Sequence, residues 1–229
     1  MRILRSLSVL AGFLAVSATV AGAGETKVYW ANQSFDGDLP LVIRRCDSDG
    51  SELSELYTSD HNVPGGMAVD VASEMLYWCE QGDRPLRRIR RADLNGSVVE
   101  TLLSGDDGGG TYPFWSPMDI ALDLAASKMY WSASYNKGYP DNDDRIYRAD
   151  LDGTNVEVVW SNLLSPKGIV IDSAAEMIYW IEQESDGTGQ RIRRSSLDKT
   201  VVQTVVTGLD AAIGLDIDVA NAKIYWTNE

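Results

Sequence analysis

Short apolar runs alternate with polar turns along the chain, and no stretch beyond residue 23 repeats its apolar positions with a helical period. Residues 166–172 (PKGIVID) form a β-branched run bounded by Pro and Gly, and residues 177–181 (MIYWI) form a second run after a polar turn. A third run begins at 191–194, and a fourth covers 201–206. Runs of this length, separated by turn residues, predict four consecutive β-strands.

The same order of strands recurs elsewhere in the chain. Third strands begin with an Ile followed by basic or aromatic residues, at 43–45, 89–91 and 146–148. Each leads to a dipeptide that tolerates positive φ in a tight hairpin turn: Asp49-Gly50, Asn95-Gly96 and Asp152-Gly153. Fourth strands are expected at 52–58, 98–103 and 156–160. The pattern predicts an all-β chain.

A Tyr-Trp pair marks the second strand of each unit, at Tyr29-Trp30, Tyr77-Trp78, Tyr130-Trp131, Tyr179-Trp180 and Tyr225-Trp226. In four units an Asp lies seven positions before the Tyr: Asp70, Asp123, Asp172 and Asp218. The pairs recur about every 50 residues, and four antiparallel strands in such a period are typical of a β-propeller blade.

These motifs resemble the YWTD (class B) repeats of the low-density lipoprotein receptor and its relatives. The match is close at 64–70, 77–78 and 89–96, and again at 166–172, 179–180 and 192–198, and the resemblance extends over residues 26–229. It implies an extracellular, non-catalytic propeller that recognises protein or peptide ligands. The Thr-Asp half of the motif is almost absent here, and this puts into question the inter-blade link that the resemblance assigns to that Asp.

The resemblance implies six blades, whereas the sequence supplies 4–5. We expect a partial or open propeller over residues 24–229, with repeats at about 26–63, 64–115, 116–164, 165–210 and 211–229. How the ring closes is left open, and self-association through open blade edges is one alternative.

Residues 1–23 are predicted to be an export signal. Arg2 and Arg5 precede an apolar run at 7–20, and small residues follow at 21–23. The run is shorter than the roughly 20 residues that span a membrane. We therefore expect a secreted or periplasmic chain without a membrane span.

The charge balance narrows the class of partner. The chain has 20 Lys and Arg against 34 Asp and Glu, a formal net charge of −14. This argues against nucleic acid and against an anionic membrane surface, since both are bound by basic residues. A cationic partner, Ca2+ or simple solubility remain as explanations.

Two further features leave alternatives open. A disulfide between Cys46 and Cys79 is permitted in an exported chain but is not required by the sequence. Asn32-Gln33-Ser34 and Asn95-Gly96-Ser97 match the N-glycosylation acceptor pattern.

The repeated residues are predicted to be scaffold. The Tyr-Trp pairs are expected to fill the space between sheets rather than to stack on sugars. The repeated Asp residues are expected to accept turn N–H groups, and the paired Arg residues of the third strands to link blades.

Strand order predicts where a ligand binds. Loops after second strands and connections after fourth strands emerge at one end of a blade, and they hold all the variation in length. Binding residues concentrate in such loops. The candidate ligand-binding residues are Phe35, Asp36, Tyr112, Trp115, Tyr135, Tyr139, Asp143, Asp144, Glu182 and Glu184. Aromatic anchors among carboxylates suit a basic or amphipathic peptide, although solvated loops are the simpler alternative.

Catalysis is the less favoured hypothesis for the function. Asp119 and Asp216 replace small residues of innermost strands and could face the propeller axis, where carboxylates hold Ca2+ in propeller hydrolases of the lactonase or esterase type. Against this, His61 is the single histidine and Gly-x-Ser-x-Gly is absent. We assign no catalytic residue and no cofactor, with Ca2+ as the alternative.

Overall fold

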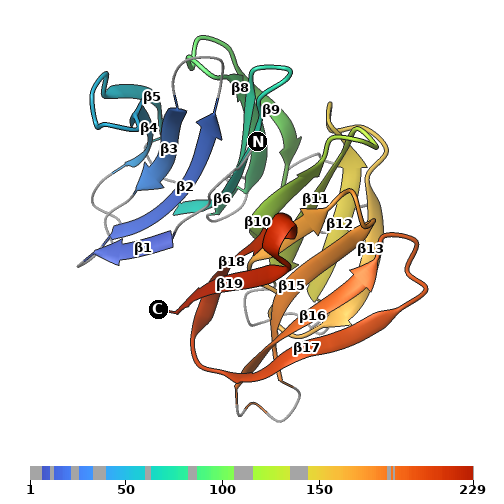
Figure 1. The fold of residues 1–229 in the computed structure, drawn as a ribbon. Helices are drawn as coiled ribbons and strands as arrows, with labels where there is room; N and C mark the ends of the chain where they lie inside the picture. Colours follow the sequence, from blue (N-terminus) through green and yellow to red (C-terminus); the bar gives the residue numbers. More distant parts are fainter. Residues whose placement is uncertain are drawn as a thin grey trace. The chain divides into compact units, whose positions relative to one another are not determined.

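The computed structural model describes residues 7–10, 13–21, 26–32, 40–59, 63–81, 87–105, 116–134, 144–184, 187 and 189–228. Within these residues the regular structure consists of β-strands and one 3-10 turn, η1 (Val219–Asn221), which confirms the all-β prediction. The strands form five antiparallel sheets (Figure 1). The chain divides into two compact units, Met1–Phe114 and Trp115–Glu229.

The first unit contains two sheets. One has the order β1 (Leu7–Leu10), β2 (Phe13–Ala21), β3 (Thr26–Asn32), β4 (Leu41–Asp47) and β5 (Ser54–Ser59). The other has the order β6 (Val63–Asp70), β7 (Met75–Gln81), β8 (Arg88–Asp93) and β9 (Val99–Ser104). Every neighbouring pair in these two sheets is antiparallel.

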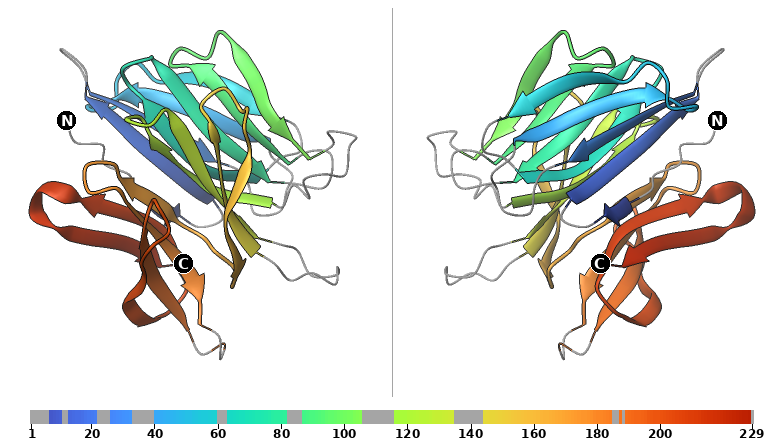
Figure 2. Two further views of the ribbon diagram at one scale, coloured as in Figure 1. Left: turned by 90° about the vertical axis from the view of Figure 1, so that its right-hand side faces the viewer. Right: turned by 90° about the vertical axis from the view of Figure 1, so that its left-hand side faces the viewer.

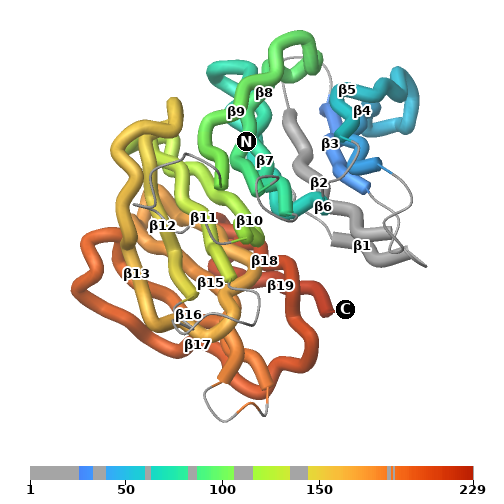
Figure 3. The backbone as a smooth tube through the Cα atoms, turned by 180° about the vertical axis from the view of Figure 1, so that it is seen from behind, coloured from blue at the N-terminus to red at the C-terminus, as the bar shows by residue number. Residues whose placement is uncertain are grey.

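The second unit contains three sheets. Two have four strands: β10 (Ser116–Asp123), β11 (Lys128–Ser134), β12 (Asp144–Asp150) and β13 (Glu157–Leu163), then β14 (Ile169–Asp172), β15 (Met177–Gln183), β16 (Gln190–Ser196) and β17 (Val202–Leu209). The third is the hairpin of β18 (Ala212–Asp218) and β19 (Lys223–Asn228). Each sheet is strongly twisted (Figure 2), and the backbone crosses it from first strand to last before entering the next (Figure 3).

The segment predicted to be an export signal contains β1 and β2. Strand β2 pairs with β3 from Val16 to Ala21, in the place that β6 holds beside β7. The first sheet therefore contains two strands, β1 and β2, that were not predicted from the sequence. The assignment of residues 1–23 as an export signal stays a prediction.

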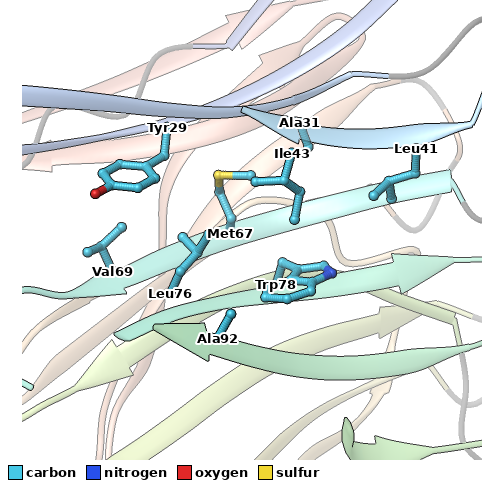
Figure 4. Packing of buried hydrophobic residues seen from close by; sticks show 9 residues of the cluster. All are labelled: Tyr29, Ala31, Leu41, Ile43, Met67, Val69, Leu76, Trp78 and Ala92. Carbon is cyan, nitrogen blue, oxygen red and sulfur yellow. The ribbon is translucent and has the colours of Figure 1, made fainter. Parts of the chain in front are cut away.

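Within each unit, the cores lie between successive sheets. In the first unit, Tyr29 and Ile43 of one sheet pack with Met67 and Trp78 of the other (Figure 4). Side chains of Trp78, Trp131 and Trp180 are at most 2% exposed. A Trp buries about 150–250 Å2, which corresponds to a gross gain of roughly 4–6 kcal/mol at 25 cal/mol per Å2. The prediction that these pairs are core residues is confirmed for Tyr29, Tyr77, Trp78, Tyr130, Trp131 and Trp180, whereas Trp30 and Tyr179 are only partly buried.

The fifth pair is the exception. Tyr225 and Trp226 on β19 are 57% and 40% exposed. The two-stranded sheet supplies no third strand beside them. Their prediction as core residues is therefore wrong for this structure, because burial of the pair depends on the strands around it.

The turns after first strands have the predicted geometry. Asp70 Oδ1 accepts the backbone N–H groups of Ala72 and Ser73 at 3.0 and 3.2 Å. The equivalent Asp123, Asp172 and Asp218 each accept one turn N–H at 3.0–3.4 Å. This confirms that the repeated Asp residues stabilise turns.

First strands of neighbouring sheets approach closely in the second unit. The backbone N–H of Gly168 donates to Ile213 O at 2.9 Å. A Cβ at Gly168 would lie 2.6 Å from that oxygen, so the repeated Gly is needed for close approach of the two backbones.

Candidate functional site

Most of the predicted ligand-binding residues lie outside the described part of the chain: Phe35, Asp36, Tyr112, Trp115, Tyr135, Tyr139 and Asp143. The other three, Asp144, Glu182 and Glu184, are described. Asp144 and Glu184 lie where strands enter or leave the variable loops, whereas Glu182 lies within β15.

Asp144 and Glu184 fix the backbone at the loop end. Asp144 Oδ2, at the start of β12, accepts the backbone N–H of Ser165 at 2.6 Å. Glu184 Oε1, just after β15, accepts the backbone N–H of Gly208 at 2.8 Å. Asp144 thus ties a loop base to the connection that follows β13, and Glu184 ties a loop base to Gly208, near the end of β17 (Val202–Leu209).

Glu182 is not a loop residue. It lies within β15, its side chain is 1% exposed, and it is surrounded by donors. Its Oε1 accepts hydrogen bonds from Arg191 Nη2 at 2.6 Å and Arg193 Nη1 at 3.1 Å, and its Oε2 accepts the indole N–H of Trp180 at 3.0 Å. The sequence placed it in the loop because a charged residue after an apolar run normally ends a strand.

Glu80 has the same arrangement in the first unit, and sequence reasoning missed it. Trp78 Nε1 donates to Glu80 Oε1 at 3.0 Å, and Arg90 Nε lies 3.4 Å from the same oxygen. Glu80 is fully buried. The signal was the repeated Trp-x-Glu-Gln at 78–81 and 180–183, since residues two apart on a strand share a face. We call each set of Trp, Glu and Arg a Trp–Glu–Arg cluster.

An aromatic side chain of the preceding sheet covers each cluster. The ring of Tyr57 on β5 lies 5.2 Å from that of Trp78, and Arg90 lies over the Tyr57 ring. In the second unit, Trp160 on β13 lies 5.5 Å from Trp180. Burial raises the pKa of Tyr57 above its ordinary value, with an opposing contribution from a hydrogen bond to Ser59. The clusters therefore belong to the contacts between sheets.

The sheet β10–β13 has no such cluster. Ala133 occupies the position of Glu80 and Glu182, and Tyr147 pairs with Trp131 where the clusters have Arg. The two rings are stacked, with centroids 5.3 Å apart and an interplanar angle of 9°.

The candidate metal ligands have structural partners. Asp119 on β10 accepts the backbone N–H of Ile120 through Oδ1 and that of Ile169 through Oδ2, both at 2.9 Å. The second bond joins β10 to the first residue of β14. Asp216 Oδ1 accepts the N–H of Ile217 at 2.8 Å. Among the residues that the structure describes, no group of three or more His, Cys, Asp or Glu side chains converges as a metal site.

The arginines and cysteines also take defined places. Arg45 Nη1 donates to Leu94 O of the neighbouring sheet at 2.8 Å, which is the expected link between blades. Arg91 and Arg148 instead bond to Glu100 and Glu157 of their own sheets, so that expectation holds only in part. The structure has no disulfide between Cys46 and Cys79, which the sequence permitted but did not require.

No helix in the described ranges is long and apolar enough to cross a membrane. No protein-family model matches the chain. Curated relatives do match. The "Low-density lipoprotein receptor-related protein 1" of Pyricularia oryzae is 27% identical over 156 residues, which are 62% of this chain and 47% of that protein. The "Low-density lipoprotein receptor-related protein 5" of Mus musculus is 33% identical over 163 residues, which are 69% of this chain and 9% of that protein.

A solved nidogen/laminin complex contains a chain that is similar in structure and sequence. Its TM-score is 0.66 at 25% identity, over 82% of this chain and 66% of that one. The chain thus spans less than half the length of the two curated relatives and about two thirds of the solved neighbour. The repeated motif, the four-stranded antiparallel sheets and these relatives agree. The chain belongs to the YWTD β-propeller family of the low-density lipoprotein receptor and its relatives.

Proposed function

We propose that the chain is a non-catalytic, exported binding module that recognises a protein or peptide through its variable loops. One observation carries the proposal: Asp144 and Glu184 bond to the backbone at the loop bases and so hold a fixed platform from which the loops project. A rigid scaffold with variable loops at one end is a common arrangement for recognition. The nidogen neighbour was solved in complex with another protein, laminin.

The proposed ligand is basic or amphipathic. The described carboxylates at the loop bases are already bonded to the scaffold, so attraction must come from loop residues such as Asp36 and Asp143 and from the net charge of −14. The aromatic loop residues Tyr112, Trp115 and Tyr139 would supply the contact area that anchors a peptide. Long-range attraction of this kind acts mainly on the association rate and weakens as salt screens it.

A pair of labelled peptides tests the proposal. One is an amphipathic peptide of Leu and Lys, and its counterpart has Glu in place of Lys. We expect fluorescence anisotropy to detect binding of the Lys peptide only, with Tyr139→Ala weakening it about tenfold. Asp49→Asn, in a short turn at the opposite end of its sheet, is the matched control and should leave the affinity unchanged. Equal binding of both peptides, or an unchanged affinity of Tyr139→Ala for the Lys peptide, would refute the proposal.

The hydrolase alternative has its own measurement. Both carboxylate oxygens of Asp119 accept scaffold N–H groups, so we propose no calcium site there. Added Ca2+ should change the melting temperature little, because only a ligand that binds the folded state stabilises it. A rise of many degrees, together with ester or lactone turnover that Asp119→Asn or Asp216→Asn abolishes, would favour the calcium-dependent hydrolase.

We also propose that β19 mediates self-association. It carries the exposed Tyr225 and Trp226, and exposed sheet edges readily pair with another strand. A second copy could pair its own β19 antiparallel to this one across a two-fold axis. Native mass spectrometry over a range of concentrations should show a dimer that Trp226→Lys weakens. A monomer at every concentration would contradict this.

A further inference from the structure

The turns between third and fourth strands share one side-chain hydrogen bond. At equivalent positions, Asp49, Asp152 and Asp198 each accept through Oδ1 the backbone N–H two residues later, at 2.9–3.1 Å. Asn95 does the same, since the N–H of Ser97 donates to its Oδ1 at 2.9 Å. One oxygen is therefore sufficient to hold this turn.

Asn95 is the one amide among these four positions, and it begins the sequence Asn95-Gly96-Ser97. Its side chain is exposed at the tip of the hairpin. Because Oδ1 alone makes the turn bond, Nδ2 is not needed by the scaffold. Asp93 supplies further support, since its Oδ1 accepts the backbone N–H of Ser97 at 2.7 Å and its Oδ2 accepts the Ser97 hydroxyl at 2.5 Å.

The second matching tripeptide begins in a different environment. Asn32 is the last residue of β3 and is paired with Val42. Its side chain is partly buried and accepts a hydrogen bond from Arg44 Nη1 at 2.9 Å. A substituent on Asn32 would have to fit beside that arginine, whereas a substituent on Asn95 would extend into water.

We propose that Asn95 carries an N-linked oligosaccharide and that Asn32 does not. In the transfer, Nδ2 attacks the anomeric carbon of an oligosaccharide held on a lipid diphosphate. The C–N bond forms as the bond to the diphosphate oxygen breaks, the lipid diphosphate leaves, and Nδ2 gives one proton to a base of the transferase. Oδ1 remains a carbonyl oxygen, so the bond from the Ser97 N–H is kept in the product.

A neighbouring apolar side chain supports this assignment. Val98 follows the turn and is 57% exposed, and a bulky hydrophilic sugar three residues away would shield it from unwanted contacts. The sugar would lie at the short-turn end of the β6–β9 sheet and leave the variable loops open. The proposal rests on the proposed export of the chain, and the relatives from Pyricularia oryzae and Mus musculus are proteins of eukaryotes, whose secretory pathway contains such a transferase.

Translation of the full chain in the presence of microsomes tests the proposal. We expect a protease-protected product that carries one glycan, removed by an endoglycosidase. Asn95→Asp should abolish the change in gel mobility that the glycan causes (the shift). The fold should be kept, because Asp occupies this place in the three equivalent turns. Ser97→Ala should also abolish it, and Asn32→Gln should leave it.

The outcomes separate the two proposals. A chain that is protected but carries no glycan overturns the assignment of Asn95 and leaves export standing. A shift that is lost in Asn32→Gln and kept in Asn95→Asp also overturns it. A chain that remains outside the microsomes and unshifted counts against export and glycosylation together.

Discussion

The sheets β10–β13 and β14–β17 have the same strand order and the same buried Tyr-Trp strand, but they place their charges at opposite positions. In β14–β17 the ions are inside: Glu182 is buried between Arg191 and Arg193. At the turn end of that sheet, Met177 pairs with Ser196, so this pair carries no charge.

In β10–β13 the ions lie at the turn end instead. Lys128 pairs with Asp150 beside the hairpin turn. Inside the sheet, Ala133 and Tyr147 take the places of Glu182 and Arg193, and Tyr147 stacks on Trp131. A methyl group and a ring thus replace the carboxylate of Glu182 and the guanidinium of Arg193, whereas Arg145 lies opposite Ala133, in the place of Arg191.

This difference shows which positions must change as a pair. Removing one partner of a buried ion pair is costly, because the remaining charge loses both water and its counter-ion. Replacing both partners by apolar groups of suitable shape can be nearly neutral. The two sheets thus fill the same interior positions with different side chains. Each arrangement can be tested by introducing residues of the other sheet.

The largest expected effect is that of Glu182→Ala. It leaves Arg191 and Arg193, each only about a quarter exposed, without their carboxylate, and the indole N–H of Trp180 without an acceptor. We expect a loss of about 3–5 kcal/mol in the free energy of unfolding, measured by urea titration. As a control, Glu157→Ala removes the 44% exposed partner of Arg148 and should cost below about 1 kcal/mol. Equal losses of stability in Glu182→Ala and Glu157→Ala would contradict the distinction between the buried ion pair and the exposed one.

Adding Arg193→Tyr to Glu182→Ala should recover part of that loss. The double variant reproduces the Ala133 and Tyr147 arrangement, with a ring beside Trp180 in place of the guanidinium. We expect a favourable coupling of about 2 kcal/mol in a double-mutant cycle. Strictly additive losses in the free energy of unfolding would show that the interior side chains of the two sheets are not interchangeable.

Removing the hydrogen bond that links the two sheets should cause a smaller loss of stability. Asp119 on β10 accepts the backbone N–H of Ile169, the first residue of β14. Asp119→Ala leaves that N–H without its acceptor, and we expect a cost of about 2 kcal/mol in urea. Asp119→Asn keeps an acceptor oxygen and should cost less. If both variants lost the same stability, the hydrogen bond would not be the reason for Asp119.

The sequence predicted what the repeat itself encodes. Strand order, turn dipeptides and the turn bonds of Asp70 follow from local pattern and were all found. Glu182 was misplaced because a run of apolar residues was taken to end at the first charge. The alternation of strand faces, with Trp180 and Glu182 on one side, would have placed it inside.

Other features depend on what surrounds a segment. Tyr225 and Trp226 have the same sequence signature as the four other pairs but are exposed, since burial requires a third strand beside them. The bond from Ile169 to Asp119 joins residues 50 positions apart, and no periodicity within one repeat encodes it. Loop side chains such as Tyr139 follow no period at all, so their positions were never predictable from pattern.

The turn ends of the two sheets should respond differently to acid. Hydrogen bonds from Lys128 and Asn155 hold the pKa of Asp150 below its ordinary value of 3.8. A carboxyl with a lower pKa in the folded chain stabilises the fold above its unfolded pKa, and this contribution is lost as the pH falls through the folded pKa. Lys128→Met with Asp150→Ser copies the Met177 and Ser196 of β14–β17.

We therefore expect the Lys128→Met, Asp150→Ser variant to lose stability less steeply than the parent as the pH drops below about 4, measured as its free energy of unfolding. The fold should be kept, because Ser196 already accepts the N–H of Thr200 at the equivalent turn. The reciprocal change, Met177→Lys with Ser196→Asp, should make the acid dependence of unfolding steeper. Parallel pH curves for all three proteins, measured by urea titration, would mean that the outer ion pair of β10–β13 contributes nothing and that the two sheets differ only in their interior.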